Sequence, residues 1–162
     1  MENQKKILVA YYSKTGNTER VAKDIASGLG ADLEKIIDQK DRSGIFGFIF
    51  GGRDAMKKRG TKIGILNYDP AAYDLVIIGT PVWASNPVPA ARTYLEENKS
   101  KIKSLAFFET SGGTAPEKIA VFIEEVVGGK AAVIAGFNQK ELREEKTYKE
   151  KIAAFVEAIN RL

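Results

Sequence analysis

The sequence contains no cysteine and no histidine. Without cysteine the chain cannot form a disulfide, a thiolate nucleophile, an iron–sulfur cluster or a thiolate zinc site. Without histidine, Ser-His-Asp and Cys-His catalysis and the common zinc sites are excluded as well. Carboxylates, lysine, tyrosine or a bound cofactor remain to carry any chemistry, and we predict no metal site.

Long hydrophobic runs are also lacking. No apolar stretch approaches the roughly 20 residues that a membrane span requires, and no signal-like segment precedes the first apolar run, so we predict a cytoplasmic protein with no membrane span. The net charge is +4, but the 25 basic and 21 acidic residues are spread along the chain, so nucleic-acid binding is not predicted. A length of 162 residues with 44% hydrophobic content predicts one domain over 1–162. The sequence predicts no oligomeric state.

Apolar runs alternate with helical patterns. The runs at 7–12, 75–79, 105–108 and 131–137 are typical of buried parallel strands, and the polar stretch 31–38 suits an edge strand beside the first. Residues Thr114 and Glu117, and then Thr147 and Glu150, have the spacing of capping boxes for two of the helices. The order βαβ…βαβαβα predicts an α/β fold: a three-layer, doubly wound parallel sheet of five strands.

The loop Ser13-Lys14-Thr15-Gly16-Asn17-Thr18 joins the first strand to the first helix. Its hydroxyl groups and the free N–H groups at a helix start suit a bound phosphate. The alternative is a polar loop whose Thr or Asn only caps the helix. Neither a Walker sequence nor the Gly-x-Gly-x-x-Gly fingerprint occurs, which disfavours the common nucleotide loops.

Two further loops follow strands. The stretch from Thr80 to Asn86 is rich in proline and should resist regular structure, and the stretch from Thr110 to Thr114 combines glycine with hydroxyl side chains. All three loops lie at carboxyl ends of parallel strands, so we expect them to converge on one crevice. Trp83 is either a rigid plate for a ligand or a core residue.

Residues 43–62 combine an aromatic cluster with Arg53, Lys57, Lys58, Arg59 and Lys62. We predict a short amphipathic helix around 45–58. Either its aromatic side chains cover one face of the sheet and the basic residues are solvated, or the segment is a lid or docking patch.

With these loops in place, the whole chain resembles the flavodoxin family in its short form. The loop 13–18 is similar to the family's [ST]-x-T-G-x-T phosphate loop in the right strand–helix context. The resemblance implies strand order 2-1-3-4-5 and bound FMN, with Trp83 stacked on the flavin ring. The cofactor-binding residues it implies are Ser13, Lys14, Thr15, Gly16, Asn17 and Thr18 at the phosphate, then Thr80, Pro81, Val82, Trp83, Ala84, Ser85 and Asn86, then Thr110, Ser111, Gly112, Gly113 and Thr114.

Three departures from the family pattern bear on mechanism. The third loop has no aromatic ring, so one flavin face is expected to be open. Ala84 and Ser85 replace a glycine that permits a peptide flip, so we expect a weakly stabilised one-electron-reduced flavin. Most flavodoxins are acidic and this chain is basic, which points to a different choice of partner.

The resemblance implies an electron carrier that works between redox partner proteins. The alternative is an FMN-dependent NAD(P)H or quinone oxidoreductase, in which a small reducible substrate meets the open flavin face. A third interpretation is a flavin-free fold member that acts by protein contact. A response regulator is rejected, because Tyr12-Ser13 and Gly79-Thr80 stand where that fold needs acidic residues.

Overall fold

The computed structural model describes residues 4–57 and 59–162. The strands are β1 (Ile7–Tyr11), β2 (Asp32–Lys35), β3 (Leu75–Trp83), β4 (Asn86–Pro87), β5 (Leu105–Ser111) and β6 (Ile134–Asn138). The helices are α1 (Asn17–Leu29), α2 (Gly44–Met56), α3 (Pro89–Asn98), α4 (Pro116–Val127), α5 (Gln139–Arg143) and α6 (Glu145–Asn160), with a 3₁₀ turn at Pro70–Ala72. Among these helices, none is long and apolar enough to cross a membrane.

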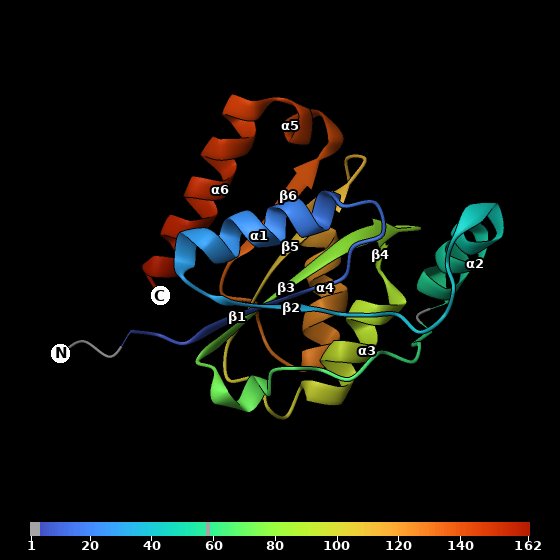
Figure 1. The fold of residues 1–162 in the computed structure, drawn as a ribbon, viewed down its shortest axis with the longest axis horizontal. Coiled ribbons are helices and arrows are strands. Elements are labelled where there is room, and N and C mark those ends of the chain that lie inside the picture. Colours follow the sequence, from blue (N-terminus) through green and yellow to red (C-terminus); the bar gives the residue numbers. More distant parts are fainter. Residues whose placement is uncertain (1–3, 58) are drawn as a thin grey trace.

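Five strands run parallel in the order β2-β1-β3-β5-β6 (Figure 1). Numbered by themselves, these five strands have the predicted order 2-1-3-4-5, so the predicted fold class is confirmed. The two-residue strand β4 was not predicted; it pairs antiparallel with the end of β3. The polar strand β2 lies at the edge, as its composition indicates.

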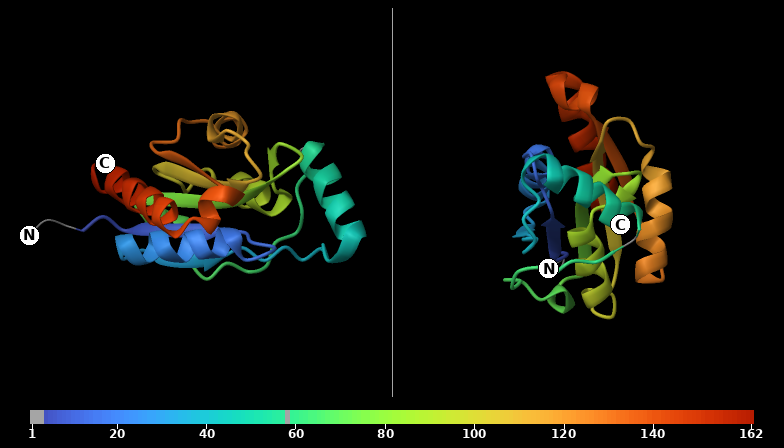
Figure 2. Two further views of the ribbon diagram at one scale, coloured as in Figure 1. Left: turned by 90° about the horizontal axis from the view of Figure 1, so that it is seen from above. Right: turned by 90° about the vertical axis from the view of Figure 1, so that its right-hand side faces the viewer.

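Helices cover both faces of the sheet, as Figure 2 shows edge-on. On one face α1, α5 and α6 pack over alternate strand residues such as Val9, Ile77 and Phe108. On the other face α3 and α4 pack over the residues between them, such as Ala10 and Ile78. Because both faces are buried, the strands need continuous apolar runs, which is why those runs predicted them.

The predicted helix in 43–62 exists as α2, but the interpretation that its aromatic side chains cover the sheet is wrong. α2 lies at the outer edge of the molecule (Figure 1) and buries only Gly47, Gly51, Asp54 and Ala55. Its bulky apolar side chains are exposed. Arg53, Lys57, Arg59 and Lys62 are exposed as predicted, and Lys58 lies outside the described residues.

Both predicted capping boxes are wrong. The N-cap of α4 is Ala115 with no side-chain bond, because Pro116 fixes the first helical position and Ser111 takes the N–H of Thr114. Thr147 lies inside α6, which begins directly after α5. A capping box forms instead at Asn138 and Glu141, at the start of the short helix α5.

Candidate functional site

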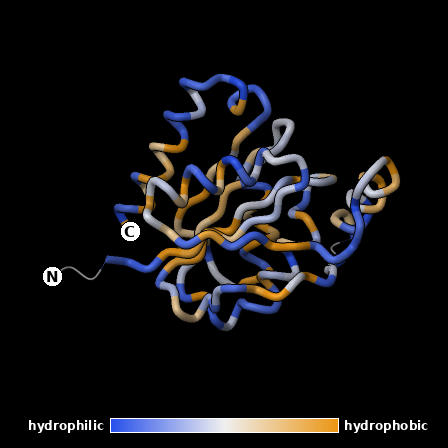
Figure 3. Tube along the Cα trace, in the orientation of Figure 1, coloured by the Kyte–Doolittle hydropathy of each residue, from blue (hydrophilic) through white to orange (hydrophobic). Residues whose placement is uncertain are grey.

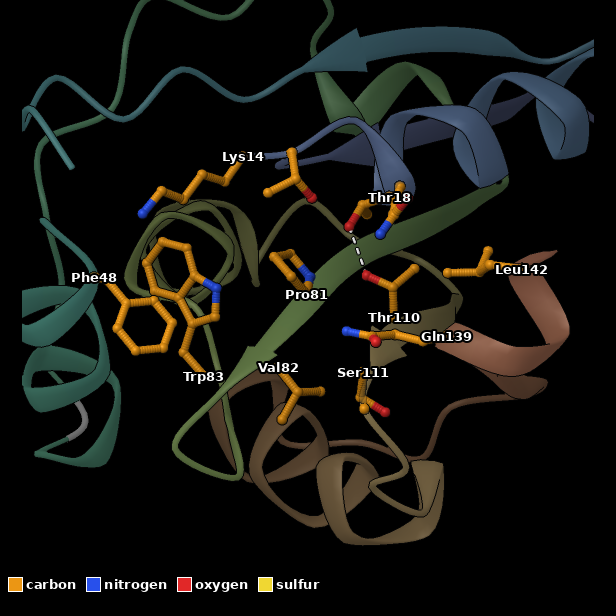
Figure 4. Close-up of a pocket in the computed structure, with 13 residues that line it drawn as sticks. Lys14, Thr18, Phe48, Pro81, Val82, Trp83, Thr110, Ser111, Gln139 and Leu142 are labelled. Atoms are coloured by element: carbon orange, nitrogen blue, oxygen red, sulfur yellow. Dashed lines mark hydrogen bonds between the residues drawn. The ribbon is translucent and has the colours of Figure 1, made fainter. Parts of the chain in front are cut away.

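The three loops meet at the carboxyl ends of β1, β3 and β5, where they line one pocket (Figure 4). The expected convergence is therefore confirmed. The lining residues are Lys14, Thr15, Asn17 and Thr18 from the first loop, Pro81, Val82 and Trp83 from the second, Thr110, Ser111 and Gly112 from the third, and Phe48, Gln139 and Leu142. None of these lining residues is acidic and one, Lys14, is a cation, so the pocket favours an anionic ligand.

The first loop presents the start of α1 without a side-chain cap. Gly16 is the N-cap residue with φ of 100°, a left-handed conformation that glycine adopts without strain. The Ser13 Oγ accepts the N–H of Gly16 at 3.1 Å and braces the turn. Since the first N–H groups of a helix have no intrahelical partner, the uncapped end of α1 offers donors and a positive dipole to an anion. The alternative in which Thr or Asn caps this helix is not what the structure has.

A hydroxyl pair joins the first loop to the third. The Oγ1 atoms of Thr18 and Thr110 lie 2.8 Å apart and both residues are buried. Only one of the two hydroxyl hydrogens is used in that bond, so the other is free to donate to a ligand in the pocket. The pair therefore fixes the spacing of the two loops and leaves a donor available.

The second loop is regular, which corrects the expectation from its prolines. β3 continues through Pro81 to Trp83, and Val82 and Trp83 pair with Pro87 and Asn86 across a hairpin. Pro81 has no N–H to donate, and it is tolerated because it lies beyond Gly79, the last β3 residue that pairs with β1. The Thr80 hydroxyl, fully buried, donates to the Pro81 carbonyl and accepts the N–H of Val88. The loop is thus held by its own hydrogen bonds.

The hairpin turns at two residues with left-handed backbone. Ala84 has φ of 47° and Ser85 has φ of 61°, the signs that a type I′ turn requires at both positions. Such a conformation costs a residue with a side chain about 1–2 kcal/mol. Both residues already have positive φ here, and the expected weak stabilisation of the one-electron-reduced flavin stays a prediction. Asn86 Nδ2 donates to the Ala84 carbonyl at 2.7 Å and holds this peptide in place.

Trp83 is half-buried between the pocket and α2. Its ring stands edge-on to Tyr12, with centroids 5.7 Å apart. A Cβ on Gly51 would lie 2.8 Å from the indole, so α2 approaches the ring at van der Waals distance. The Lys14 ammonium lies 5.7 Å from the ring centroid. Trp83 is therefore clamped on one side by α2 while the pocket borders another side, and it is not a core residue.

A buried cluster of charges holds the base of α2. Arg42 Nε lies 2.7 Å from Asp38 Oδ2, and its Nη1 lies 3.0 Å from Asp54 Oδ2. Lys40 adds a contact to Asp54 at 2.9 Å. Burial alone would raise the pKa of Asp54, but the hydrogen bonds from Lys40 and Arg42 outweigh it and the pKa is lowered. The Asp54 carboxyl therefore remains ionised, and its ion pairs tie α2 to the chain that precedes it.

The third loop carries no ring. The Ser111 Oγ accepts the N–H groups of Gly113 and Thr114, which folds the loop back on itself. Gly112 and Gly113 are exposed. The sequence prediction of an open side to the pocket rests on these residues.

Glu109 lies just before this loop and is buried. The charged groups around it do not offset the effect of burial on its pKa. Burial raises its pKa to about 7, although Ser111 and Lys151 act in the opposite direction. Its Oε2 atom has no hydrogen-bond partner among the described residues. The carboxyl lies one residue from Thr110 on β5 but does not line the pocket.

Solved structures with the same fold include flavoproteins. A flavoprotein from Lactobacillus acidophilus NCFM, crystallised in complex with FMN, is 27% identical over 88% of this chain and 99% of its own, with a TM-score of 0.71. Oxidised flavodoxin 2 from Bacillus cereus is 22% identical over 96% of this chain and 98% of its own, with a TM-score of 0.58, and shows the fold. This chain has the flavodoxin-like fold. No protein-family model matches its sequence, and a search of curated proteins finds no match.

In this flavodoxin-like protein the predicted cofactor residues divide into two groups. Ten of them line the pocket, as given above. The others, which support the loops or lie beyond the pocket, are Ser13, Gly16, Thr80, Ala84, Ser85, Asn86, Gly113 and Thr114. Their proposed contact with a cofactor stays a prediction.

Three lining residues were missed by the sequence reasoning. Gln139 and Leu142 follow β6, and the rule that loops at strand carboxyl ends converge could have found Gln139. Phe48 comes from α2, whose position depends on packing that no local pattern encodes.

Proposed function

We propose that this chain binds FMN in the pocket and carries electrons between redox partner proteins. The observation that carries the proposal is the uncapped start of α1, surrounded by hydroxyl side chains, at one end of a pocket that has Trp83 at its side. The Lactobacillus acidophilus flavoprotein, crystallised with FMN, supports the choice of ligand.

The residues present fit the phosphate of FMN. Thr15, Asn17 and Thr18 supply side-chain donors, and the first backbone N–H groups of α1 supply the rest. Lys14 provides the one cation among the described lining residues. A phosphate would thereby satisfy donors that the protein itself leaves without partners.

The residues also fit a flat ring. Trp83 offers an aromatic face that α2 and Tyr12 hold in place, and Thr110, Ser111, Gly112 and Gln139 offer polar groups to a ring edge. FMN, when bound, supplies one- and two-electron redox chemistry, and the protein supplies orientation and electrostatics. Cytoplasmic location, the single domain and the lack of a nucleic-acid partner stay predictions.

The second candidate is an FMN-dependent NAD(P)H or quinone oxidoreductase. The third loop favours it, because Ser111, Gly112 and Gly113 bring no ring to cover the ligand. A small reducible substrate could then approach the flavin directly. Rapid mixing of the FMN-loaded protein with NADH and NADPH separates the two: a carrier should not oxidise either at a useful rate, and fast flavin reduction would favour the enzyme.

The FMN site itself is tested by Thr15→Ala combined with Thr18→Ala. Each lost hydrogen bond to a charged group is worth about 1.5–3 kcal/mol, so FMN should bind at least about 100-fold more weakly while riboflavin, which lacks the phosphate, changes little. Affinities are measured by flavin fluorescence. Thr147→Ala is the control, because Thr147 lies on α6 and does not line the pocket. Equal losses for both flavins would refute the placement, and a protein with no FMN affinity would act without flavin.

A further inference from the structure

The burial pattern of α2 is the reverse of that of a typical surface helix. A surface helix normally buries its apolar side chains, but α2 buries small residues and exposes large ones. The exposed set, here called the α2 face, has exposed fractions from 44% to 77%. It consists of Ile45, Phe46, Phe48, Ile49, Phe50 and Met56. Figure 3 shows this hydrophobic segment at the outer edge of the molecule. Six large apolar side chains exposed on one helix mark a candidate interaction site.

The orientation of α2 is fixed by close packing. A Cβ on Gly47 would lie 2.1 Å from the Arg42 backbone, and a Cβ on Gly51 would lie 2.8 Å from Trp83. No larger side chain could therefore face inward at these two positions. Arg42, which is paired with Asp38, also forms an ion pair with Asp54 on the buried side of α2. The outward direction of the α2 face is thus built into the fold.

The exposed charges within 43–62 have one sign, and Asp41, just before the helix, is an exposed carboxylate. Arg53, Lys57 and Lys62 are exposed at and beyond the end of the helix. The only acidic residue in 43–62 is Asp54, which is buried and lies within 3.0 Å of both Arg42 and Lys40. The exposed surface of the segment therefore joins apolar side chains to cations, and it is complementary to an apolar partner with a negative rim.

We propose that α2 docks this protein on the surface of a bilayer that contains anionic lipids. Phe and Ile side chains on an exposed helix enter the headgroup and acyl boundary, and nearby Lys and Arg pair with lipid phosphates. α2 projects from the edge of the body, as Figures 1 and 2 show, which suits insertion into a plane. A second copy docked through this face would bring its own cations against those of the first.

The docked face reaches the pocket. A pocket of about 480 Å³ is lined by both α2 and the β3–β4 hairpin, and its lining includes Ile49, Met56, Val82 and Trp83. Val82 and Trp83 also line the crevice between the three loops. A bilayer held on α2 would therefore lie next to the side of the molecule where the flavin is proposed. The docking proposal itself does not require FMN.

The test is co-sedimentation of the full chain with vesicles of phosphatidylglycerol and phosphatidylcholine, and with phosphatidylcholine alone. We expect binding to the anionic vesicles at low salt, weaker binding at high salt, and little binding to the neutral vesicles. The variant R53Q/K57Q/K62Q should bind about 100-fold more weakly, since each cation near an anionic surface contributes about 5-fold. The variant I45S/F46S/I49S should lose about 10-fold per residue.

Matched controls carry the same changes elsewhere. K103Q/K118Q/K146Q removes the same charge from exposed positions outside α2, and I65S/V121S/L162S removes three exposed apolar side chains. Both controls should bind like the parent, and circular dichroism should show that all variants remain folded. Absence of binding to anionic vesicles at low salt would overturn the proposal, as would equal losses in the control variants. Self-association lost only in I45S/F46S/I49S, without vesicle binding, would assign the face to a second copy instead.

Discussion

Glu109 should make the stability of this protein fall as the pH rises through the neutral range. The carboxyl is 1% exposed, and its Oε2 has no hydrogen-bond partner among the described residues. Burial raises its pKa from 4.5 to about 7 in the folded state. Each pKa unit corresponds to about 1.4 kcal/mol, so the free energy of unfolding should change by at most about 3 kcal/mol.

The sign follows from proton binding. Between pH 4.5 and about 7 the folded protein keeps the Glu109 proton and the unfolded chain has lost it. The folded state therefore binds more protons, and stability decreases with rising pH across this window. Below pH 4.5 the contribution is fully present, and above about 7 it is lost. Because the chain has no histidine, few other groups titrate in the same window.

Urea unfolding of the parent and of Glu109→Gln, from acid to mildly alkaline pH, measures the effect. The amide keeps the shape and does not titrate, so the variant should have a nearly flat profile between about pH 5 and 7 and exceed the parent in stability above neutral pH. Glu97→Gln, at an exposed position on α3, is the matched control and should follow the parent. A parent profile that is flat between pH 5 and 7, or a Glu109→Gln profile that parallels it, would refute the reasoning.

Two further predictions concern the β3–β4 hairpin. Trp83→Ala should weaken FMN binding by about 5-fold to 150-fold if stacking on the flavin is comparable to base stacking, and Trp83→Phe should recover part of that loss. FMN affinity and unfolding of the apo-protein are measured for each variant. An unchanged affinity per folded molecule would make the role of Trp83 structural. Ala84→Gly with Ser85→Gly should stabilise the protein by about 1 kcal/mol in urea unfolding, because relief of positive φ at both positions exceeds the entropy cost of glycine, and a loss of stability would contradict this.

The sheet was predictable because its strands are buried on both faces. Runs such as 75–79 and 105–108 carry that burial in their composition, and the phosphate-type loop after the first run marks the sheet edge where ligands bind. Convergence of the three loops then follows from parallel topology alone. This reasoning needs no knowledge of any side-chain contact.

The hairpin was not predictable by the same means. The usual sequence signal of a type I′ turn is Asn-Gly or Asp-Gly, but here Ala84 and Ser85 occupy the two central positions. Because Trp83 pairs with Asn86, the two residues between them must turn the chain with positive φ. Tertiary and cross-strand contacts thus override local preference, and three prolines nearby made the stretch look irregular.

The predictions of two helix starts from capping boxes were wrong for a related reason. The Thr-x-x-Glu spacing occurs at 114–117 and 147–150, but a capping box also requires that the helix begin at the residue after the threonine. Pro116 and the tight junction between α5 and α6 set those starts instead. Spacing alone therefore identifies candidates for a cap without locating the helix end.

The position of α2 brings these observations together. A helix rich in Phe and Ile would ordinarily be assigned to the core, yet glycine at 47 and 51 lets its backbone approach Arg42 and Trp83 and leaves the large side chains no room inside. The same glycine at 51 places α2 against the indole that borders the pocket. Trp83 therefore belongs at once to the proposed flavin site and to the base of the proposed docking face. Residues 43–62 contain five basic residues and one acidic residue, so the segment that carries the α2 face is itself basic, and α2 is expected to recognise the anionic bilayer proposed above.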